Sequence, residues 1–199
     1  GDEVRTFCMN PNGEVVQENY SGIATVNGHS YANYKTPNTN FALLVSEKFT
    51  EPFKEPIQYG QHIARLANML GGGILVQRFG DLLEGRRSTP ERIASSVITP
   101  TLTCATPGDL SLVIPYRQMT SIIEMLQALD KIAPGTASRY TLLYGIEVKF
   151  YSARVKLTQQ LETEGVKNLF TIGDGAGVTR GLLQASASGV YVARTICER

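Results

Sequence analysis

The sequence predicts an α+β domain in which strands and helices alternate irregularly. Short apolar and β-branched runs near the N-terminus have the length of strands and are separated by turn residues. Two longer segments, residues 57–70 and 116–134, carry apolar residues at helical spacing. The order of these segments follows no regular βαβ pattern, and the chain contains no internal repeat, so we expect a mixed α and β architecture.

The N-terminal quarter of the chain is expected to be all strand and turn. The strand-like runs cover residues 4–9, 14–17, 22–26 and 41–46, and the sequence NPNG at 10–13 has the composition of a turn. The segment NYKTPNTN before the last run has loop composition.

The central part is predicted to contain three helices. In residues 57–70, Tyr59, Ile63, Leu66 and Leu70 fall on one face, and three consecutive glycines then end the helix before a strand, ILVQRF. Thr89 is placed to cap a short helix that has Pro90 in its first turn. Residues 116–134 carry a longer apolar stripe, which we interpret as core packing and which consists of Met119, Ile122, Ile123, Leu126, Leu129 and Ile132.

The C-terminal part is predicted to return to strands and to end in a helix. Residues 141–150 and 153–157 alternate in polarity as strands do, and 168–172 is an apolar strand-like run. Residues 181–197 are then expected to form a helix with Ser186, Gly189 and Ala193 along one face.

Composition limits the function classes. The 199 residues include 42% apolar and 19% charged residues, so a folded core is expected. The formal charge of +1 argues against a nucleic-acid binder. Three widely spaced cysteines and two histidines predict neither a disulfide framework nor a metal site. We find no run long enough to cross a membrane and no signal peptide, and we expect a cytoplasmic protein.

The segment FTIGDGAGVTRG, residues 170–181, has the pattern of a ligand-binding turn between a strand and a helix. Glycines allow the backbone to approach a ligand, and a helix N-terminus offers unpaired N–H groups. Asp174 would repel a phosphate but could accept hydrogen bonds from hydroxyl groups, such as those of a ribose or a ribityl chain. Alternatively, Asp174 is only a helix cap and the glycines only serve packing.

Two charged segments have a functional and a structural interpretation. VQRFGDLLEGRR, residues 76–87, could present Arg78, Arg86 and Arg87 to an anion, or it could be a solvated loop with local ion pairs around Asp81. In EVKFYSARVK, residues 147–156, alternation places Lys149 and Tyr151 on one face of the predicted strand, where they could meet a ligand. The alternative is a half-buried strand with a polar outer face.

The chain resembles the uncharacterised FAD-dependent (NAD/FAD-utilising) dehydrogenases over nearly its whole length. The matching segments occur in order and are TFCMNPNGEVV, NGHSYANYKTPNTNFALLV, LGGGILVQRFGDLLEGRRST, TPGDLSLVIP, LLYGIEVKFYS and GDGAGVTRGLLQASASG. The last of them resembles the final flavin-binding motif of such oxidoreductases. The resemblance implies that FAD contacts this motif, with Asp174 on the ribityl chain and the following helix N-terminus at the N1/O2 edge of the flavin. The implied cofactor-binding residues are Gly173, Asp174, Gly175, Ala176, Gly181, Leu182 and Leu183. With a flavin in place, Arg78, Lys149 and Tyr151 are the candidates for the substrate or the flavin edge, where a cation would stabilise reduced flavin.

One family feature is absent from this sequence. The dehydrogenases begin with a Rossmann unit that carries G-x-G-x-x-G, and this chain has no such pattern. We therefore expect a C-terminal portion, with a substrate or cap domain at 1–157 and the last strand, turn and helix of the FAD-binding domain at 158–199. The missing Rossmann segment would be its partner, and without that segment the chain could expose an apolar patch and self-associate.

The resemblance implies a flavoprotein oxidoreductase as the parent protein. It would transfer electrons or hydride through FAD, with NAD(P)H as a possible donor and a small molecule as substrate, whereas this portion alone would be inactive. The alternative, suggested by the missing G-x-G-x-x-G, is a non-catalytic cap or protein-interaction module whose chemistry lies elsewhere.

Overall fold

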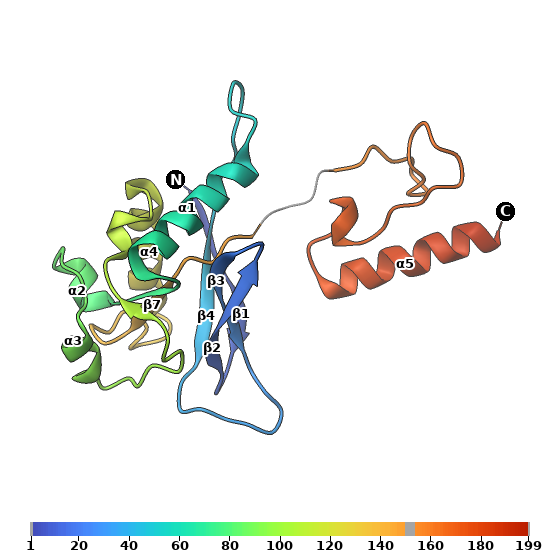
Figure 1. Ribbon diagram of the computed structural model, residues 1–199. Helices are drawn as coiled ribbons and strands as arrows, with labels where there is room; N and C mark the ends of the chain where they lie inside the picture. The colour runs from blue at the N-terminus through green and yellow to red at the C-terminus, as the bar shows by residue number, and fades with distance from the viewer. Residues whose placement is uncertain (1, 150–153, 199) are drawn as a thin grey trace. The chain divides into compact units, whose positions relative to one another are not determined.

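The computed structural model describes residues 2–149 and 154–198, which fall into two compact units, Gly1–Val148 and Lys149–Arg199 (Figure 1). The boundary lies earlier than the one expected at 157/158, and the functional identities given to the two parts stay predictions. The fold class is α+β, as the sequence predicts.

The first unit opens with four strands. β1 (Glu3–Asn10) pairs with β4 (Asn40–Ser46), and β2 (Glu14–Tyr20) forms a hairpin with β3 (Ile23–His29), both antiparallel. A further small sheet has the order β6-β5-β7, in which β5 (Leu75–Arg78) is parallel to β6 (Thr106–Pro107) and antiparallel to β7 (Leu142–Gly145).

Helices pack around these strands. α1 (Pro56–Gly71) contacts β3 and β5, and α4 (Tyr116–Asp130) contacts β4 and β1. The short helices α2 (Phe79–Leu83) and α3 (Pro90–Ala94) follow β5, and a 3₁₀ turn, η1 (Leu110–Leu112), precedes α4. The main hydrophobic core brings together residues of α1, β5, α2, η1 and α4 and consists of Ala67, Leu75, Phe79, Leu82, Leu110, Val113, Met119, Leu126 and Ile146.

Several predicted elements of this unit are confirmed and others are corrected. The four N-terminal strands form, and Thr89 caps α3 by accepting a hydrogen bond from the Arg92 N–H. In α1 the buried residues are Ala64 and Ala67, whereas Leu70 of the predicted apolar face is 44% exposed. α4 ends at Asp130 rather than at 134, and Ile132 is 81% exposed. β7 is shorter than the predicted strand, because residues 146–149 form no ladder with a neighbour.

The second unit consists of loops, a 3₁₀ turn η2 (Asp174–Ala176) and the helix α5 (Leu182–Cys197). The strands predicted at 153–157 and 168–172 do not form in its described residues. Leu157 bridges Thr163 and Phe170 bridges Glu162, but neither pairing extends into a ladder. The predicted C-terminal helix forms as α5, which buries Ser188 and Val192, whereas Ser186 and Ala193 of its small-residue face are exposed.

Candidate functional site

The glycine–acid turn, defined as residues 173–181, connects a loop to α5. Gly173 has φ 71° and ψ −164°, and Gly177 has φ 69°, both conformations that glycine adopts far more easily than other residues. Gly173 donates its N–H to Ser188 Oγ at 3.0 Å, and Ser188 in turn donates to the carbonyl of Ala185 at 2.7 Å. These bonds attach the start of the turn to the second turn of α5.

Asp174 projects an exposed carboxylate from this turn. The hydroxyl of Thr179, a buried residue, donates to Asp174 Oδ1 and so fixes one side of the carboxylate. A carboxylate has about four lone-pair directions, so it can accept further hydrogen bonds from a ligand. A Cβ added to Gly175 would meet no atom within 4 Å, so open space lies beside the backbone next to Asp174.

The N-terminus of α5 lies at the end of the same turn. Its N-cap residue, Gly181, provides no side-chain cap, and a Cβ added there would also meet open space. The first helical residues, Leu182 and Leu183, are 90% and 83% exposed. The first N–H groups of a helix have no intrahelical partner and carry a partial positive charge. The turn thus presents an acceptor, Asp174, and the donors of α5 from one short segment.

All seven predicted cofactor-binding residues belong to the second unit and lie in this turn or the first turn of α5. The three predicted substrate or flavin-edge residues are distributed differently. Arg78 ends β5 in the first unit, Lys149 is an exposed residue at the start of the second unit, and Tyr151 lies outside the described residues. The contacts expected for these three residues stay predictions.

A cluster of arginines surrounds Asp81, which is completely buried in α2. Arg86 Nε donates to Asp81 Oδ1 at 2.9 Å, and the Ser88 hydroxyl donates to Asp81 Oδ2 at 2.8 Å. Arg92 Nη1 and Arg78 Nε lie 3.8 Å and 3.9 Å from the same carboxylate. The segment 76–87 therefore contains local ion pairs, as one interpretation expected, but it is built on a buried acid and a helix rather than on a solvated loop.

The environment of Asp81 favours its charged form. Burial alone would raise the pKa of this carboxyl group, but the hydrogen bonds from Ser88 and Arg86 and the nearby charge of Arg78 outweigh it and lower the pKa below its ordinary value. Asp81 is thus a buried carboxylate that holds arginine side chains in place.

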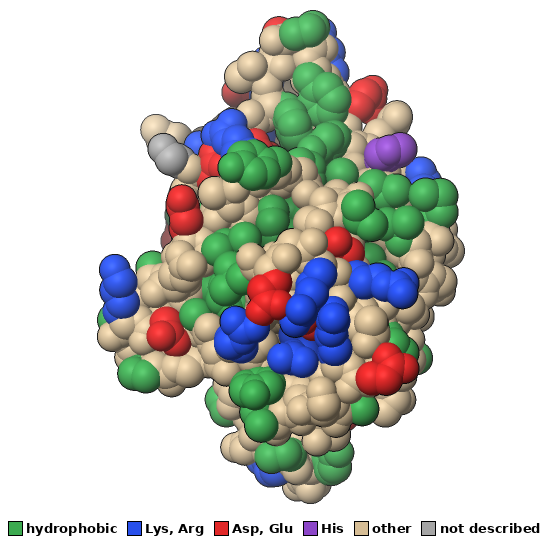
Figure 2. Space-filling model, turned by 90° about the vertical axis from the view of Figure 1, so that its left-hand side faces the viewer, with side chains coloured by type: hydrophobic (Ala, Val, Ile, Leu, Met, Phe, Trp, Pro, Cys, Tyr) green, Lys and Arg blue, Asp and Glu red, His purple; other side chains and the backbone are tan. Residues whose placement is uncertain are grey.

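The sequence analysis missed two arginines of this cluster and one of its acidic partners. Arg92 comes from α3, and Arg139 precedes β7 and forms an ion pair with Glu84. Glu84 also pairs with Arg86 at 2.7 Å. Arg139 follows Asp81 by more than fifty residues, and no local spacing connects them, so only the fold shows that they belong together. Figure 2 shows Lys and Arg side chains gathered with acidic side chains on the face that includes α2 and α3.

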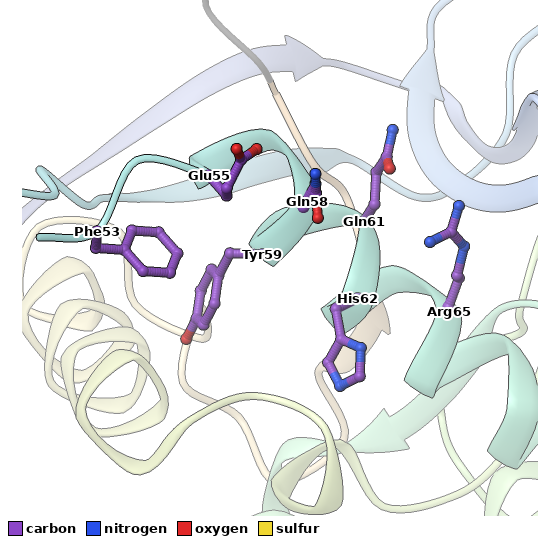
Figure 3. A pocket seen from close by; sticks show the side chains of 7 residues that line it. All are labelled: Phe53, Glu55, Gln58, Tyr59, Gln61, His62 and Arg65. Atoms are coloured by element: carbon purple, nitrogen blue, oxygen red, sulfur yellow. The ribbon is translucent and has the colours of Figure 1, made fainter.

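A depression lies along the outer side of α1, where Phe53, Tyr59, His62 and Arg65 are among the lining residues (Figure 3). The rings of Phe53 and Tyr59 are 6.1 Å apart and perpendicular. The remaining side chains are spread along the helix and do not converge on one point, as Figure 3 shows. This arrangement lacks the convergent polar groups that are typical of a small-molecule site.

The described residues provide neither a cluster of metal ligands nor a membrane-spanning helix. Within residues 2–149 and 154–198, we find no group of three or more His, Cys, Asp or Glu side chains that could hold a metal ion. In the same residues, every helix is too short or too polar to serve as a membrane span.

Comparison with known proteins places the chain in a family. The family described as FAD-dependent protein, C-terminal domain-like, matches residues 1–150, which are three quarters of the chain, and the chain belongs to this family. An uncharacterized protein of Clostridium beijerinckii is 32% identical over 208 residues, an alignment that includes 98% of this chain. The chain spans 38% of the length of that relative.

Proposed function

We propose that this chain, as a member of the FAD-dependent protein C-terminal domain-like family, is the C-terminal part of a flavoprotein oxidoreductase whose FAD contacts the glycine–acid turn. The family match supports a flavoprotein context. The turn itself lies beyond the matched residues 1–150, so its role is argued from its own geometry.

The observation that carries the proposal is the pairing of an exposed carboxylate with an uncapped helix N-terminus on one glycine turn. A flavin nucleotide carries hydroxyl groups on its ribityl chain, which suit Asp174 as an acceptor. The electron-rich edge of its ring suits the N–H groups at the start of α5, where the helix dipole stabilises negative charge. The open space beside Gly175 and Gly181 allows such a ligand to approach the backbone. FAD, when bound, supplies the electron or hydride transfer.

The rest of the cofactor would be bound by a segment outside these 199 residues. Two facts support this: the sequence lacks G-x-G-x-x-G, and the chain spans 38% of its relative from Clostridium beijerinckii. We propose a Rossmann segment as this partner. Arg78, Lys149 and Tyr151 are candidates for the substrate or for the flavin edge, and a reduced nicotinamide is a candidate electron donor.

To test this proposal, the flavin content and the FAD affinity of the proposed longer protein are measured for the wild type and for two variants. Asp174→Asn keeps the size of the side chain, but it removes the negative charge and one of the two oxygens that would accept hydrogen bonds from the ribityl hydroxyl groups. We expect FAD affinity to fall about tenfold to a hundredfold, as for the loss of one or two hydrogen bonds to a charged group. Glu164→Gln, which removes an exposed carboxylate from the same unit outside the turn, is the matched control and should bind FAD as the wild type does.

The result also decides between this proposal and a non-catalytic interaction module. The exposed apolar residues Leu182, Leu183 and Val190 on α5 favour that second candidate, because such a helix face can bind a partner protein. If the longer protein carries no flavin and binds none when FAD is added, the oxidoreductase proposal is wrong and the module is favoured. If Asp174→Asn binds FAD unchanged, the assignment of the turn fails.

A further inference from the structure

The arginine cluster in the first unit contains more positive than negative charge. Within residues 2–149 and 154–198, four guanidinium groups, those of Arg78, Arg86, Arg92 and Arg139, are in ion pairs with two carboxylates, those of Asp81 and Glu84. Two positive charges are therefore left over inside a small region. Arg87 and Glu91, which directly precede Ser88 and Arg92 in the sequence, carry opposite charges and leave this sum unchanged.

The buried carboxylate of Asp81 holds these arginine side chains in place. Asp81 is fully buried and has three of the guanidinium groups within 4 Å, while its second oxygen accepts from Ser88. The side chains of Arg86 and Arg92 are 44% and 37% exposed, so their attachment to Asp81 leaves part of each guanidinium open to solvent. Side chains fixed in this way lose little conformational entropy when a ligand binds.

Arg78 is the least exposed arginine among those that contact Asp81. Its guanidinium lies 5.2 Å from the centre of the Tyr140 ring, and Nη1 donates to the carbonyl of Arg92 at 3.1 Å. Its buried Nε has no hydrogen-bond partner in the part of the chain that the structure describes. A buried donor without a partner is costly, and such groups are often completed by a water or a ligand.

We propose that the cluster of Arg78, Arg86, Arg92 and Arg139 binds the phosphoryl group of a small molecule. Guanidinium groups bind phosphate oxygens through paired N–H donors, and a phosphate dianion matches the two unbalanced positive charges. This site belongs to the first unit and to different residues than the glycine–acid turn, so it stands or falls independently of the proposed FAD contact.

A purely structural role would explain less of the arrangement. One arginine beside Asp81 and one beside Glu84 would neutralise both carboxylates, whereas the cluster adds two more cations that repel one another. A buried acid that holds two partly exposed arginines, Arg86 and Arg92, above a third that is largely buried, Arg78, is expected where an anion is bound.

The test is the binding of inorganic pyrophosphate to the 199-residue chain, measured by isothermal titration calorimetry at constant ionic strength. Constant ionic strength separates a defined site from general attraction to positive charge. We expect one saturable site, about tenfold weaker in Arg92→Gln, because one charge-assisted donor group is lost. Arg92→Lys keeps the charge but not the paired donors, and it should fall between the two. Arg65→Gln, an exposed arginine on α1, is the control.

The binding measurements have results that would overturn the proposal. Equal affinity in the wild type and in Arg92→Gln, or no saturable binding by either, overturns the proposal. If Arg92→Gln does not fold, as judged by circular dichroism, Arg139→Gln replaces it, because that side chain is 60% exposed and Glu84 keeps its contact with Arg86. ADP and glycerol phosphate then distinguish the source of the phosphoryl group. Tighter binding of ADP indicates a nucleotide, and tighter binding of glycerol phosphate indicates a phosphorylated substrate.

Discussion

At the scale of single residues, Asp81 and Asp174 show how two aspartates in glycine-containing segments can have opposite environments. Asp81 is buried and its carboxylate is satisfied by Ser88 and arginine side chains. Asp174 is exposed, and its carboxylate is oriented by Thr179 from within the same turn. Both follow a glycine in the sequence, so the difference comes from the tertiary structure.

The lowered pKa of Asp81 predicts how stability depends on pH. The folded protein holds this proton less tightly than the unfolded chain, so Asp81 stabilises the fold above the ordinary pKa of about 3.9. This stabilisation is lost as the pH falls below that value toward the lower pKa of the folded state. Asp81→Asn should lower the free energy of unfolding by roughly 3 kcal/mol at pH 7, because the arginines lose their buried partner.

Urea unfolding of the wild type and of Asp81→Asn at pH 7 and at pH 3 checks this prediction. The difference in unfolding free energy between them should be smaller at pH 3, because there the unfolded wild-type chain binds a proton at Asp81 that the folded protein holds less tightly. Glu164→Gln should match the wild type at both values. A difference that is constant with pH would mean that the Asp81 charge does not stabilise the fold.

At the scale of elements, local pattern identified the helices better than the strands of the second unit. Apolar spacing predicted α1 and α4, and a face of small residues accompanied the prediction of α5, because a helix forms its hydrogen bonds within one segment. A strand needs a partner, and in the described residues Phe170 finds only a single bridge to Glu162. The sequence around 168–172 has the composition of a strand but contains no information about which segment it pairs with.

The candidate sites also differ in how far the sequence predicted them, because one is contiguous in the sequence and the other is assembled by the fold. The glycine–acid turn was recognisable because its residues are contiguous, and the Thr89 cap because it precedes Pro90 directly. The arginine cluster was recognised only in part. Arg78 and Arg86 stand close to Asp81 in sequence, whereas Arg139 reaches the cluster only through the folding of the segment before β7.

The two glycines that flank Asp174 are predicted to have separable roles. Gly173 adopts a backbone conformation that is almost restricted to glycine, so Gly173→Ala should destabilise the turn by about 1–3 kcal/mol. Gly175 does not have a positive φ, and a methyl group there would meet open space. Gly175→Ala should therefore leave the stability of the chain nearly unchanged.

In the proposed longer protein, however, the added methyl group of Gly175→Ala would occupy the space through which FAD approaches the backbone. We expect normal thermal unfolding with weaker FAD binding, whereas Gly173→Ala should impair both. Thermal denaturation and FAD titration on the same samples provide the comparison. Unchanged FAD affinity in Gly175→Ala would contradict the placement of the cofactor beside this residue.

At the scale of the whole molecule, the chain exposes apolar side chains on α5 that a soluble domain would ordinarily cover. Leu182 and Leu183 are almost fully exposed, and Tyr191 and Ile196 are about half exposed. Large exposed apolar patches tend to mark surfaces of association. We propose that in the longer protein a Rossmann segment covers α5, and that the 199-residue chain alone uses this face to associate with a second copy.

The final prediction concerns this self-association. Sedimentation velocity of the 199-residue chain should show a mass that rises with concentration, because burying the leucines of two copies removes apolar surface from water. The double substitution Leu182→Ser and Leu183→Ser should keep the chain monomeric without unfolding it, since neither side chain is part of a core. Met69→Ser, which removes an apolar side chain that is 73% exposed on α1, serves as the control. The prediction is wrong if the wild-type chain stays monomeric over a wide concentration range. It is also wrong if Met69→Ser is as monomeric as the double variant, because the exposed start of α5 would then not be what drives association.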